Sequence, residues 1–387
     1  MNSLTEILSG QPAYRLKQIY QAWFDVKINN YEEITTLSKE MREKLKEVSW
    51  LVVKLNTMQE SKLDDTKKAL LELADGETVE TVLMGRVDKK ENSEREKRYT
   101  ICISSQVGCA MGCKFCATGK FGFKRNLTVE EIVDQVRFWQ RYLAPTGGTI
   151  SNVVLMGQGE PFLNYENVKE ALRIILENTE IGPSKITVST VGIPAMLDKM
   201  LEDKNFPGVR LAISLHSAID KERGKIIPSN SPNFISFLKD WAKKYHERFS
   251  SRALFLGLEY TMLDGINDDD KHLKALIKLA SNVGRVRINL IPYNSTVIAR
   301  SEATRQSFGQ SVIPAKAGIR DFMTADSRFR GNDNKNECVN DNFTGSPIET
   351  IEAWHDKLLK TGFVCTIRRS QGQDIAAACG QLRNLTK

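Results

Sequence analysis

The first part of the chain has the hydrophobic spacing of helices. Pro12 to Phe24 places its large apolar side chains along one side at helical spacing, and Leu37 to Leu55 is rich in strong helix formers. These two patterns predict a small helical module over residues 1–60.

From Lys68 to Met84 the pattern changes to two short runs, KALLELA and TVETVLM, which flank Asp75-Gly76. An Asp-Gly pair between two such runs is typical of a β-hairpin turn. We therefore expect a hairpin over residues 61–98 that links the helical module to the rest of the chain.

Beyond residue 98, β-branched runs alternate with helical patterns. The start of the first helix is predicted at Thr128, because Thr128 and Glu131 have the spacing of a capping box. Repeated βα units imply a parallel sheet, so residues 99–296 are expected to form a partial (β/α)6 TIM-like barrel of the α/β class, with active residues at the carboxyl ends of its strands. The expected strands are Thr100–Ser104, Asn152–Met156, Ile186–Thr190, Leu211–Leu215, Leu256–Met262 and Arg287–Ile291.

One segment interrupts this alternation. No leucine occurs between Leu290 and Leu358, and residues 297–343 mix Ser, Arg, Asp, Asn and Gly without a sustained period. We expect a flexible, dispensable polar insertion, which resembles translated palindromic repeats of bacterial genes and costs little because loop-closure entropy grows slowly with length. Residues 344–387 are expected to hold a helix near Ile348, a strand over Phe363 to Arg368 and a loop.

The composition is that of an ordinary globular protein. The 387 residues are 41% hydrophobic and 27% charged, which excludes a disordered or collagen-like protein. No stretch approaches the roughly 18 consecutive apolar residues of a membrane-spanning helix, and Glu6 lies where a signal peptide would be basic or apolar. We therefore expect a cytoplasmic protein with no membrane partner.

The formal net charge is +7, and the excess of basic residues lies beyond residue 100. A basic surface suits a polyanion such as RNA, but mildly basic surfaces also occur on proteins that bind no nucleic acid. Near residue 120, basic and aromatic residues alternate, a mixture suited to phosphate attraction and base stacking. They are Lys114, Lys120, Lys124 and Arg125, with Phe115, Phe121 and Phe123. An ordinary basic surface is an equally open interpretation.

Cysteine usage points to metal or thiol chemistry. Four of the seven cysteines lie between residues 102 and 116, which favours such chemistry over structural disulfides. Cys109, Cys113 and Cys116 form a CxxxCxxC motif after the first expected barrel strand. Three thiolates are one short of the four that close an ordinary [4Fe-4S] site, so one iron would stay open to a ligand. The alternatives are a zinc site, with Cys102 as the nearest candidate for a fourth ligand, and reduced thiols without a metal.

The CxxxCxxC motif, with the aromatic Phe115 inside it, resembles the radical S-adenosylmethionine (SAM) superfamily. The resemblance implies a [4Fe-4S] cluster on the three cysteines and a SAM molecule on the open iron, whose one-electron cleavage yields a 5′-deoxyadenosyl radical. Further motifs, in order along the chain, resemble the dual-specificity rRNA and tRNA adenine-C2 methyltransferases of this superfamily. They are QIYQ from Gln18, LSKE from Leu37, SQVGC from Ser105, MGQGEP from Met156, SLH from Ser214, NLIPYN from Asn289 and DIAAACGQL from Asp374.

The resemblance also implies catalytic roles. One SAM molecule methylates Cys379, a second gives the radical that removes hydrogen from the S-methyl group, and the resulting methylene adds to C2 of adenine. Cys102 stands at the position of the thiol that releases the RNA by forming a disulfide with Cys379, and Glu80 matches the proposed general base. The implied SAM contacts are Gly159, Glu160, Ser189, Ser214, Leu215, His216 and Asn294. Cys338 and Cys365 match no position of the family and are expected to be bystanders.

The chemistry of adenine fits a radical route. C2 is an electrophilic carbon with a hardly acidic hydrogen, so the electrophilic methyl group of SAM cannot alkylate it by displacement, whereas a carbon radical can add to it. The resemblance implies 23S rRNA and tRNA as substrates, flavodoxin or ferredoxin as the electron donor, and a monomeric protein. The helical module resembles the RNA-binding accessory domain of the family, which would hold folded RNA by shape and phosphate contacts.

Two alternatives stay open. Cfr-type enzymes methylate adenine at C8 with the same cluster and reactive cysteines, but Glu160-Pro161 and the long helical N-terminus favour C2. The other alternative is an inactive RNA-binding homologue, because Ser295-Thr296 replaces the proline and glycine-containing turn that usually follows Asn294 in the family. The presence of every matched reactive residue argues against an inactive protein.

Overall fold

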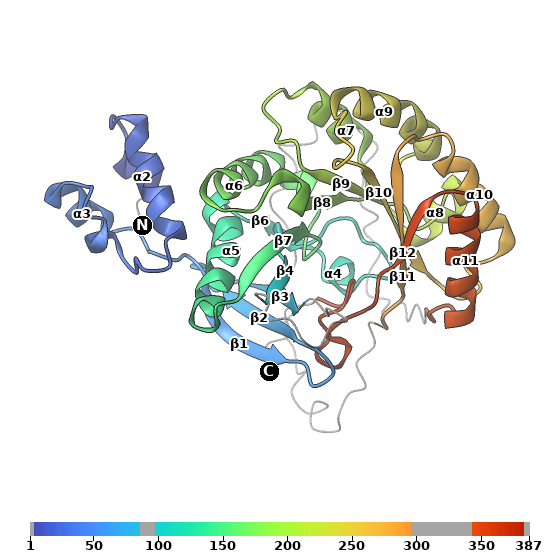
Figure 1. Cartoon of the computed structure of the whole chain (residues 1–387), viewed down its shortest axis with the longest axis horizontal. Coiled ribbons are helices and arrows are strands. Elements are labelled where there is room, and N and C mark those ends of the chain that lie inside the picture. The colour runs from blue at the N-terminus through green and yellow to red at the C-terminus, as the bar shows by residue number, and fades with distance from the viewer. Residues whose placement is uncertain (1–3, 86–96, 296–342, 383–387) are drawn as a thin grey trace. The chain divides into compact units, whose positions relative to one another are not determined.

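The computed structural model describes residues 4–85, 97–295 and 343–382 (Figure 1). All of these described residues belong to one compact unit. The expected polar insertion, with Cys338 inside it, therefore lies outside the described residues except for its last residue, Phe343.

A ten-stranded sheet forms the framework of the fold, in the order β1-β2-β3-β4-β7-β8-β9-β10-β11-β12. Neighbouring strands are antiparallel from β1 to β4 and parallel from β4 to β12. These strands are β1 (Lys54–Glu60), β2 (Thr66–Glu72), β3 (Thr78–Gly85), β4 (Arg98–Cys102), β7 (Thr149–Leu155), β8 (Ile186–Thr190), β9 (Arg210–Ser214), β10 (Leu256–Met262), β11 (Val286–Pro292) and β12 (Val364–Ile367). A separate two-stranded sheet holds β5 (Gln106–Gly108) and β6 (Phe123–Asn126).

The partial barrel expected beyond residue 98 is confirmed. The six expected strands are β4 and β7 to β11, and the expected strand at Phe363 to Arg368 is β12. β12 pairs with β11 in parallel, from Arg287↔Val364 to Leu290↔Ile367, so the parallel sheet extends one strand beyond the expected (β/α)6 unit. The helix that begins at Ile348 makes this possible, because a helical crossover returns the chain to the sheet edge in the parallel direction.

The expected hairpin is also confirmed, as the antiparallel pair β2 and β3 on either side of the Asp75-Gly76 turn. β1 covers the other edge of β2. The expected helix over Leu37 to Leu55 is therefore wrong in its second half, since its helical part ends at Leu45 and β1 begins at Lys54. Pairing with β2 overrides the local helix propensity of this segment.

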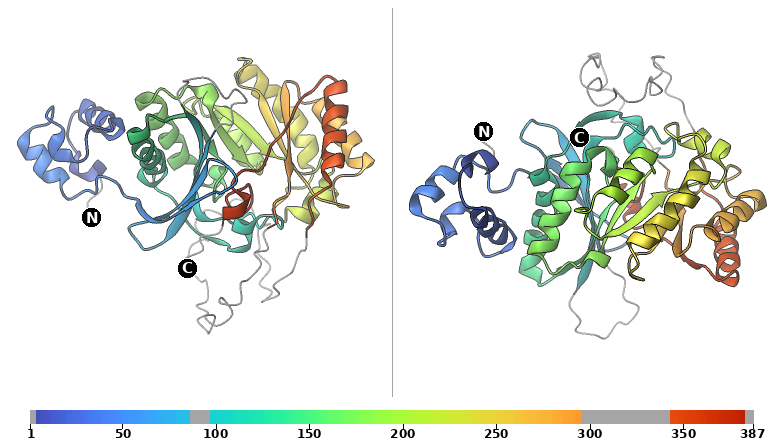
Figure 2. Two further views of the ribbon diagram at one scale, coloured as in Figure 1. Left: turned by 60° about the horizontal axis from the view of Figure 1, so that its bottom comes forward. Right: turned by 90° about the horizontal axis from the view of Figure 1, so that it is seen from above.

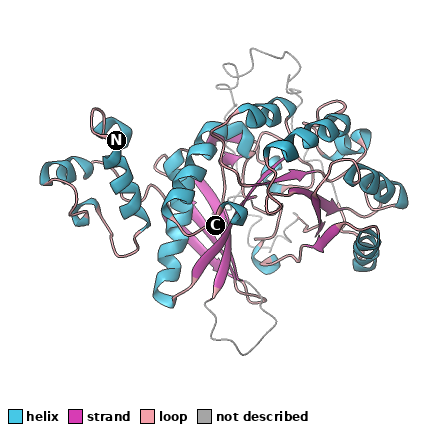
Figure 3. Cartoon of the chain, turned by 45° about the horizontal axis from the view of Figure 1, so that its top comes forward, coloured by secondary structure: helices cyan, strands magenta, loops and turns pink. Residues whose placement is uncertain are grey.

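Most of the helices that follow β4 cover the outer face of the curved sheet, whose inner face encloses the barrel interior, and the N-terminal helices lie to one side of them (Figure 3). The largest cluster of buried apolar side chains lies between these helices and the strands. The helices are α1 (Leu4–Ile7), α2 (Ala13–Phe24), α3 (Lys39–Leu45), α4 (Ala117–Lys120), α5 (Val129–Leu143), α6 (Tyr165–Asn178), α7 (Pro194–Glu202), α8 (Asp220–Ile226), α9 (Phe234–Arg248), α10 (Asp270–Ala280) and α11 (Ile348–Lys360). Short 3-10 helices span Tyr31–Glu33, Ala144–Thr146, Pro161–Asn164, Pro183–Lys185 and Gln373–Ile375.

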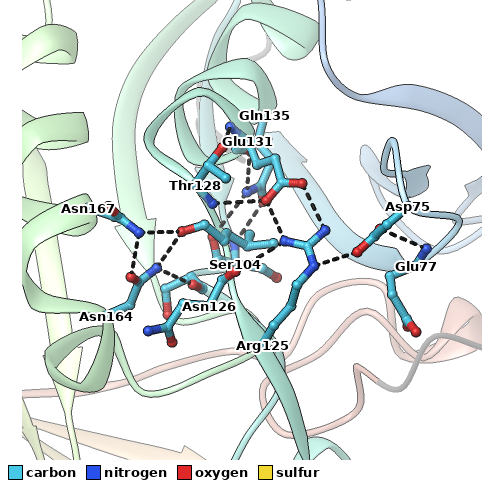
Figure 4. Close-up of polar contacts among 12 residues, drawn as sticks. Asp75, Glu77, Ser104, Arg125, Asn126, Thr128, Glu131, Gln135, Asn164 and Asn167 are labelled. Atoms are coloured by element: carbon cyan, nitrogen blue, oxygen red, sulfur yellow. Dashed lines mark hydrogen bonds and ion pairs between the residues drawn. The ribbon is translucent and has the colours of Figure 1, made fainter. Parts of the chain in front are cut away.

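An ion-pair network joins the hairpin turn to the first barrel helix (Figure 4). The expected capping box is confirmed at the start of α5, where Thr128 Oγ1 accepts from Glu131 N at 3.2 Å and Glu131 Oε2 accepts from Thr128 N at 2.9 Å. Arg125 donates to both carboxylate oxygens of Glu131, at 2.8 and 2.9 Å, and to Asp75 at 2.6 Å. Arg125 is therefore part of the scaffold.

Arg137 joins α5 to the N-terminal helical module. Its guanidinium pairs with Asp134 and donates to the carbonyl oxygens of Trp23, at 3.1 Å, and Trp50, at 2.8 Å. Asp134 also accepts a hydrogen bond from Val52 N at 2.6 Å. Both side chains of the ion pair are only 1% exposed, so each charge depends on the other for its stability.

We expect Arg137→Met to destabilise the protein by about 3–5 kcal/mol, because it leaves the Asp134 carboxylate buried without its counter-ion. Urea unfolding followed by tryptophan fluorescence measures the loss. The double variant Arg137→Met, Asp134→Leu removes both charges and should regain a large part of the stability. Equal stability of Arg137→Met and the unchanged protein would contradict this account of the contact.

Candidate active site

The cysteines of the CxxxCxxC motif lie in one loop between β5 and α4. Main-chain hydrogen bonds hold this cluster loop, from Cys109 N to Gly122 O at 2.8 Å and from Cys116 N to Cys113 O at 3.1 Å. The strand before it ends at Gly108, which has a φ of +75° and where a Cβ would lie 2.0 Å from Gly122 O. Only glycine allows the backbone to approach this closely.

The pocket around the motif is apolar. Cys109, Cys113 and Cys116 pack against a cluster made of Met111, Phe115, Val191, Ile226, Ile227 and Leu263. Burial raises the pKa of Cys109 to about 12 and that of Cys113 well above its ordinary value, and the neighbouring Cys116 adds to both shifts. Such thiols become thiolates when a bound metal supplies positive charge beside them.

The donor set fits an iron–sulfur cluster better than zinc. Among the described residues, no three His, Cys, Asp or Glu side chains converge as ligands of one metal ion. Cys102, the candidate fourth zinc ligand, belongs to a different apolar cluster from the motif cysteines. The zinc alternative therefore lacks its ligand set, whereas separate thiols in one pocket suit a cluster in which each iron takes one thiolate.

Cys102 and Cys379 lie near each other although they are far apart in the sequence. Cys102 ends β4 and is buried against Ala377 and Leu382, which flank Cys379. Burial, and then the neighbouring Cys379, raise the pKa of Cys102 to about 12. The Cys379 side chain is exposed. The described cysteines are all free thiols, so the disulfide implied by the resemblance is not formed here.

The Cys379 loop, residues 371–382, lies between the first strands of the sheet and the region of α4 (Figure 2). On one side, Asp374 accepts from Ser61 Oγ at 2.7 Å and from Lys62 N at 2.8 Å, both in the turn between β1 and β2. On the other side, Gly380 O accepts from Ala117 N at 2.7 Å. Because Ala117 directly follows the last cysteine of the motif, the loop connects the turn between β1 and β2 to the cluster loop.

Glu80 is buried in β3, where a solvated strand residue would ordinarily be expected. Its Oε1 lies 3.0 Å from Lys68 Nζ on β2. Val82, two residues further along β3, is the partner of Cys102 on β4. Since every second residue of a strand projects from the same face, Glu80 and Cys102 share one face of the sheet.

The expected SAM contacts after β7 and β8 form a closely packed turn. Gly159 has a φ of +99°, and a Cβ there would lie 2.5 Å from Gln106 Cβ. Glu160 is buried, and its two oxygens accept from Phe162 N at 3.0 Å and from Val191 N at 2.7 Å. Burial raises the pKa of this carboxyl.

The remaining expected contacts lie at the ends of later strands. Ser189 and Ser214 have their hydroxyl oxygens 3.3 Å apart. His216 Nδ1 accepts from Thr261 N at 3.0 Å, and burial lowers its pKa to about 3, so the ring is neutral. The two last contacts are Leu215, which is buried and donates its N–H to Glu259 O at 3.0 Å, and Asn294, whose Oδ1 accepts from Gln373 at 3.0 Å.

Comparison with known proteins decides the family. The radical SAM superfamily matches residues 103–277. The dual-specificity RNA methyltransferase RlmN of Campylobacter hominis is 35% identical over 390 residues, which cover 99% of this chain and 95% of that protein. This chain belongs to the RlmN family. A probable RlmN of Thermotoga neapolitana is 36% identical and covers 98% of this chain and 94% of its own.

A solved structure of similar fold supports the assignment. The crystal structure of a radical SAM methyltransferase from Sphaerobacter thermophilus matches with a TM-score of 0.75 and 32% identity, over 99% of this chain and 98% of that one. The radical SAM fold class is therefore confirmed. Enzymes of this superfamily use a [4Fe-4S] cluster and SAM, and these are the cofactors of this RlmN family member. Among the residues described, no helix is long and apolar enough to cross a membrane.

The basic and aromatic residues near residue 120 do not form one surface in this RlmN family member. Phe115 is buried beside His216, with ring centres 4.6 Å apart, and Arg125 is held by its carboxylate partners. Phe121 is 58% exposed, and the exposed Lys124 pairs with Glu77 at 2.6 Å. Within this set, base stacking is therefore open to Phe121 and excluded for Phe115.

Sequence reasoning missed Arg368, which follows β12. Its guanidinium donates to the sulfur of Met156 at 2.9 Å and to Glu259 Oε2 at 3.3 Å. It interacts electrostatically with both Cys102 and Cys379, and it lines a cavity of about 190 Å³ in the barrel interior. The period of two along β12 could have predicted this position. Arg368 lies two residues after Thr366, so the two side chains project from the same face of the sheet, toward the barrel interior.

We expect the reaction of Cys102 with methyl methanethiosulfonate to accelerate about tenfold per pH unit from pH 7 to pH 9, because only the thiolate reacts. This range lies below the pKa of about 12 that burial gives the thiol. At each pH, Arg368→Gln should react more slowly than the protein with Arg368, since the guanidinium lowers the pKa of Cys102. Peptide mass spectrometry of Cys379→Ala protein measures both rates, and a rate independent of pH would contradict the burial argument.

Proposed function

We propose that this chain methylates C2 of one adenine in 23S rRNA and in tRNA through an S-methylated Cys379. The position of the Cys379 loop carries the proposal: it contacts the cluster loop on one side and the turn between β1 and β2 on the other. This position supports access to one thiol both from the cofactor site and from the sheet face that holds Cys102 and Glu80.

Cys379 is proposed to carry the transferred carbon. When bound, the cluster and two SAM molecules supply a methyl group for this thiol and a carbon radical that removes one hydrogen atom from that methyl group. The methylene carbon on Cys379 then adds to C2 of the adenine. The residues beside Cys379, Ala377, Ala378 and Gly380, are small, which leaves space around its thiol for the two reaction partners.

Glu80 and Cys102 are proposed to complete the reaction. After the new carbon–carbon bond forms, the ring loses the C2 proton, which Glu80 accepts, and one electron. This electron would return to the bound cluster, which is left oxidised once it has supplied the electron for SAM cleavage. A thioether then joins Cys379 to the RNA. The Cys102 thiolate attacks the sulfur of Cys379, a disulfide forms and the sulfur–carbon bond breaks. The carbon keeps the electron pair and takes a proton to become the methyl group.

The residues proposed to hold SAM are Gly159, Glu160, Ser189, Ser214, Leu215, His216 and Asn294, and those proposed to hold the cluster are Cys109, Cys113 and Cys116. Leu215 is fully buried, and its N–H donates to Glu259 O while its carbonyl oxygen accepts from Arg223 Nε at 3.0 Å. The neutral ring of His216 has Nδ1 occupied as an acceptor, so Nε2 would act as the donor.

RNA is the proposed macromolecular partner, with the helical module of residues 1–60 as an accessory RNA-binding part. Flavodoxin or ferredoxin is proposed as the electron donor, and a monomer as the active form. The RlmN relatives and Glu160-Pro161 support methylation at C2 over C8.

Mass spectrometry of nucleosides from a strain that lacks this activity tests the proposal. Expression of the chain should yield 2-methyladenosine in both 23S rRNA and tRNA, and Cys379→Ala should yield none. 8-Methyladenosine would favour the C8 alternative. A protein with a full cluster that produces neither nucleoside would be the inactive RNA-binding homologue.

A further inference from the structure

Lys68 and Glu80 form a buried ion pair beneath the Cys379 loop. Nζ of Lys68 lies 3.0 Å from Oε1 of Glu80, and their side chains are only 8% and 3% exposed. A pair buried this deeply is retained at a cost in desolvation, and removal of one partner leaves the other charge uncompensated. Replacement of either residue by an uncharged one is therefore expected to disturb the structure around the pair.

The same ammonium reaches the loop that carries Cys379. Lys68 Nζ donates to the carbonyl oxygen of Ala376 at 3.2 Å. Ala376 lies three residues before Cys379 and has a φ of +50°, in the left-handed region that residues with a side chain rarely adopt. The hydrogen bond from Lys68 supports the backbone at the point where it is strained.

The strand register brings the releasing thiol to the same face. Val82 on β3 is paired with Lys68 on β2 and with Cys102 on β4. Residues paired across strands project from the same face, so Lys68 and Cys102 flank Val82 under the Cys379 loop. Lys68 thus contacts the candidate proton acceptor and the loop of the carbon carrier at once.

We propose that Lys68 is a positioning residue that holds Glu80 and the Cys379 loop in one fixed arrangement, so that the carboxylate meets the C2 proton while Cys379 carries the RNA. This inference rests on the proposed function, because the proton acceptor is the one assigned there. Lys68 acts through Glu80 and Ala376. A cation with two short contacts is suited to this task, since it ties a side chain of one strand to the main chain of a loop that is distant in sequence.

Lys68→Met tests the proposal, because methionine keeps most of the buried side-chain volume and loses both polar contacts. Lys67→Met is the matched control. Lys67 is the neighbouring residue on β2, projects from the opposite face and pairs with Glu60 at 2.6 Å. Three quantities are measured for each reconstituted protein: S-methylation of Cys379 with SAM alone, single-turnover formation of 2-methyladenosine in tRNA, and hydrogen exchange of the Cys379 loop.

We expect Lys68→Met to lower the rate of 2-methyladenosine formation about a hundredfold, within the range for a misplaced general base, while S-methylation of Cys379 stays near the control rate. Hydrogen exchange at residues 376–379 should be faster than in Lys67→Met. Lys68→Arg should regain most of the rate. The double variant Lys68→Met, Glu80→Gln should be no slower than the slower single variant, because the two residues act as a unit.

Wild-type rates in Lys68→Met, or single-variant effects that multiply in the double variant, would overturn the proposal. An equal loss of S-methylation and of C2 methylation would overturn it too, since that result marks a collapsed loop. If the unchanged protein forms no 2-methyladenosine, the proposed function fails. Hydrogen exchange then still decides whether Lys68 holds the loop.

Discussion

Cys102→Ala is expected to purify with RNA covalently bound to Cys379. Formation of the proposed thioether needs only Cys379, whereas its cleavage needs a second thiol close enough to attack the sulfur. The structure offers Cys102 for this attack, because it is buried against the residues that flank Cys379. The variant should therefore complete less than about one turnover and accumulate the adduct.

Denaturing gel electrophoresis before and after nuclease treatment detects this adduct, and peptide mass spectrometry locates it. Cys365→Ala is the matched control, since Cys365 is also a buried strand cysteine but pairs with Ile288 on β11, away from the Cys379 loop. It should release its product normally. Full turnover by Cys102→Ala, with no bound RNA, would remove the proposed role of Cys102.

Replacement of Cys109, Cys113 or Cys116 by Ala is expected to abolish methylation and the broad visible absorption of the reconstituted protein. A cluster held by three thiolates has no spare protein ligand, and among the cysteines that the structure describes no other one packs in the apolar pocket of the motif. The helices and strands should persist, because these side chains are only partly buried and lie in a loop.

Iron and sulfide analysis after anaerobic reconstitution measures this effect, with circular dichroism as the check on folding. Cys365→Ala serves again as the control and should keep its iron. Stoichiometric zinc without iron in the unchanged protein would contradict the cluster assignment and restore the zinc alternative.

The long periodic segments could be read from the sequence because their signal is local and repeated. β-branched runs between helical patterns identify β4 and β7 to β11, and Thr128 with Glu131 marks the start of α5. Residues 46–55 were misassigned because helix propensity is a local quantity, whereas the pairing of β1 with β2 is a tertiary contact.

The partners of individual charges could not be read from the sequence. Lys67 and Lys68 are adjacent and identical in type, yet Lys67 pairs with an exposed glutamate and Lys68 with the buried Glu80. Arg125 is a residue of the type that contacts RNA, but its guanidinium donates hydrogen bonds to Asp75 and Glu131 instead. Charge is visible in a sequence, whereas the counter-charge depends on which strands become neighbours.

The hydrogen count of the transferred methyl group tests the central claim most directly. SAM with a fully deuterated methyl group is supplied to the reconstituted protein, and the 2-methyladenosine formed is analysed by mass spectrometry. Transfer through a methylene on Cys379 predicts a methyl group that keeps two deuterium atoms, with the third atom taken as a proton at release, and none formed by Cys379→Ala. A methyl group that keeps all three deuterium atoms would contradict the account, because it would mean direct transfer from SAM to the RNA.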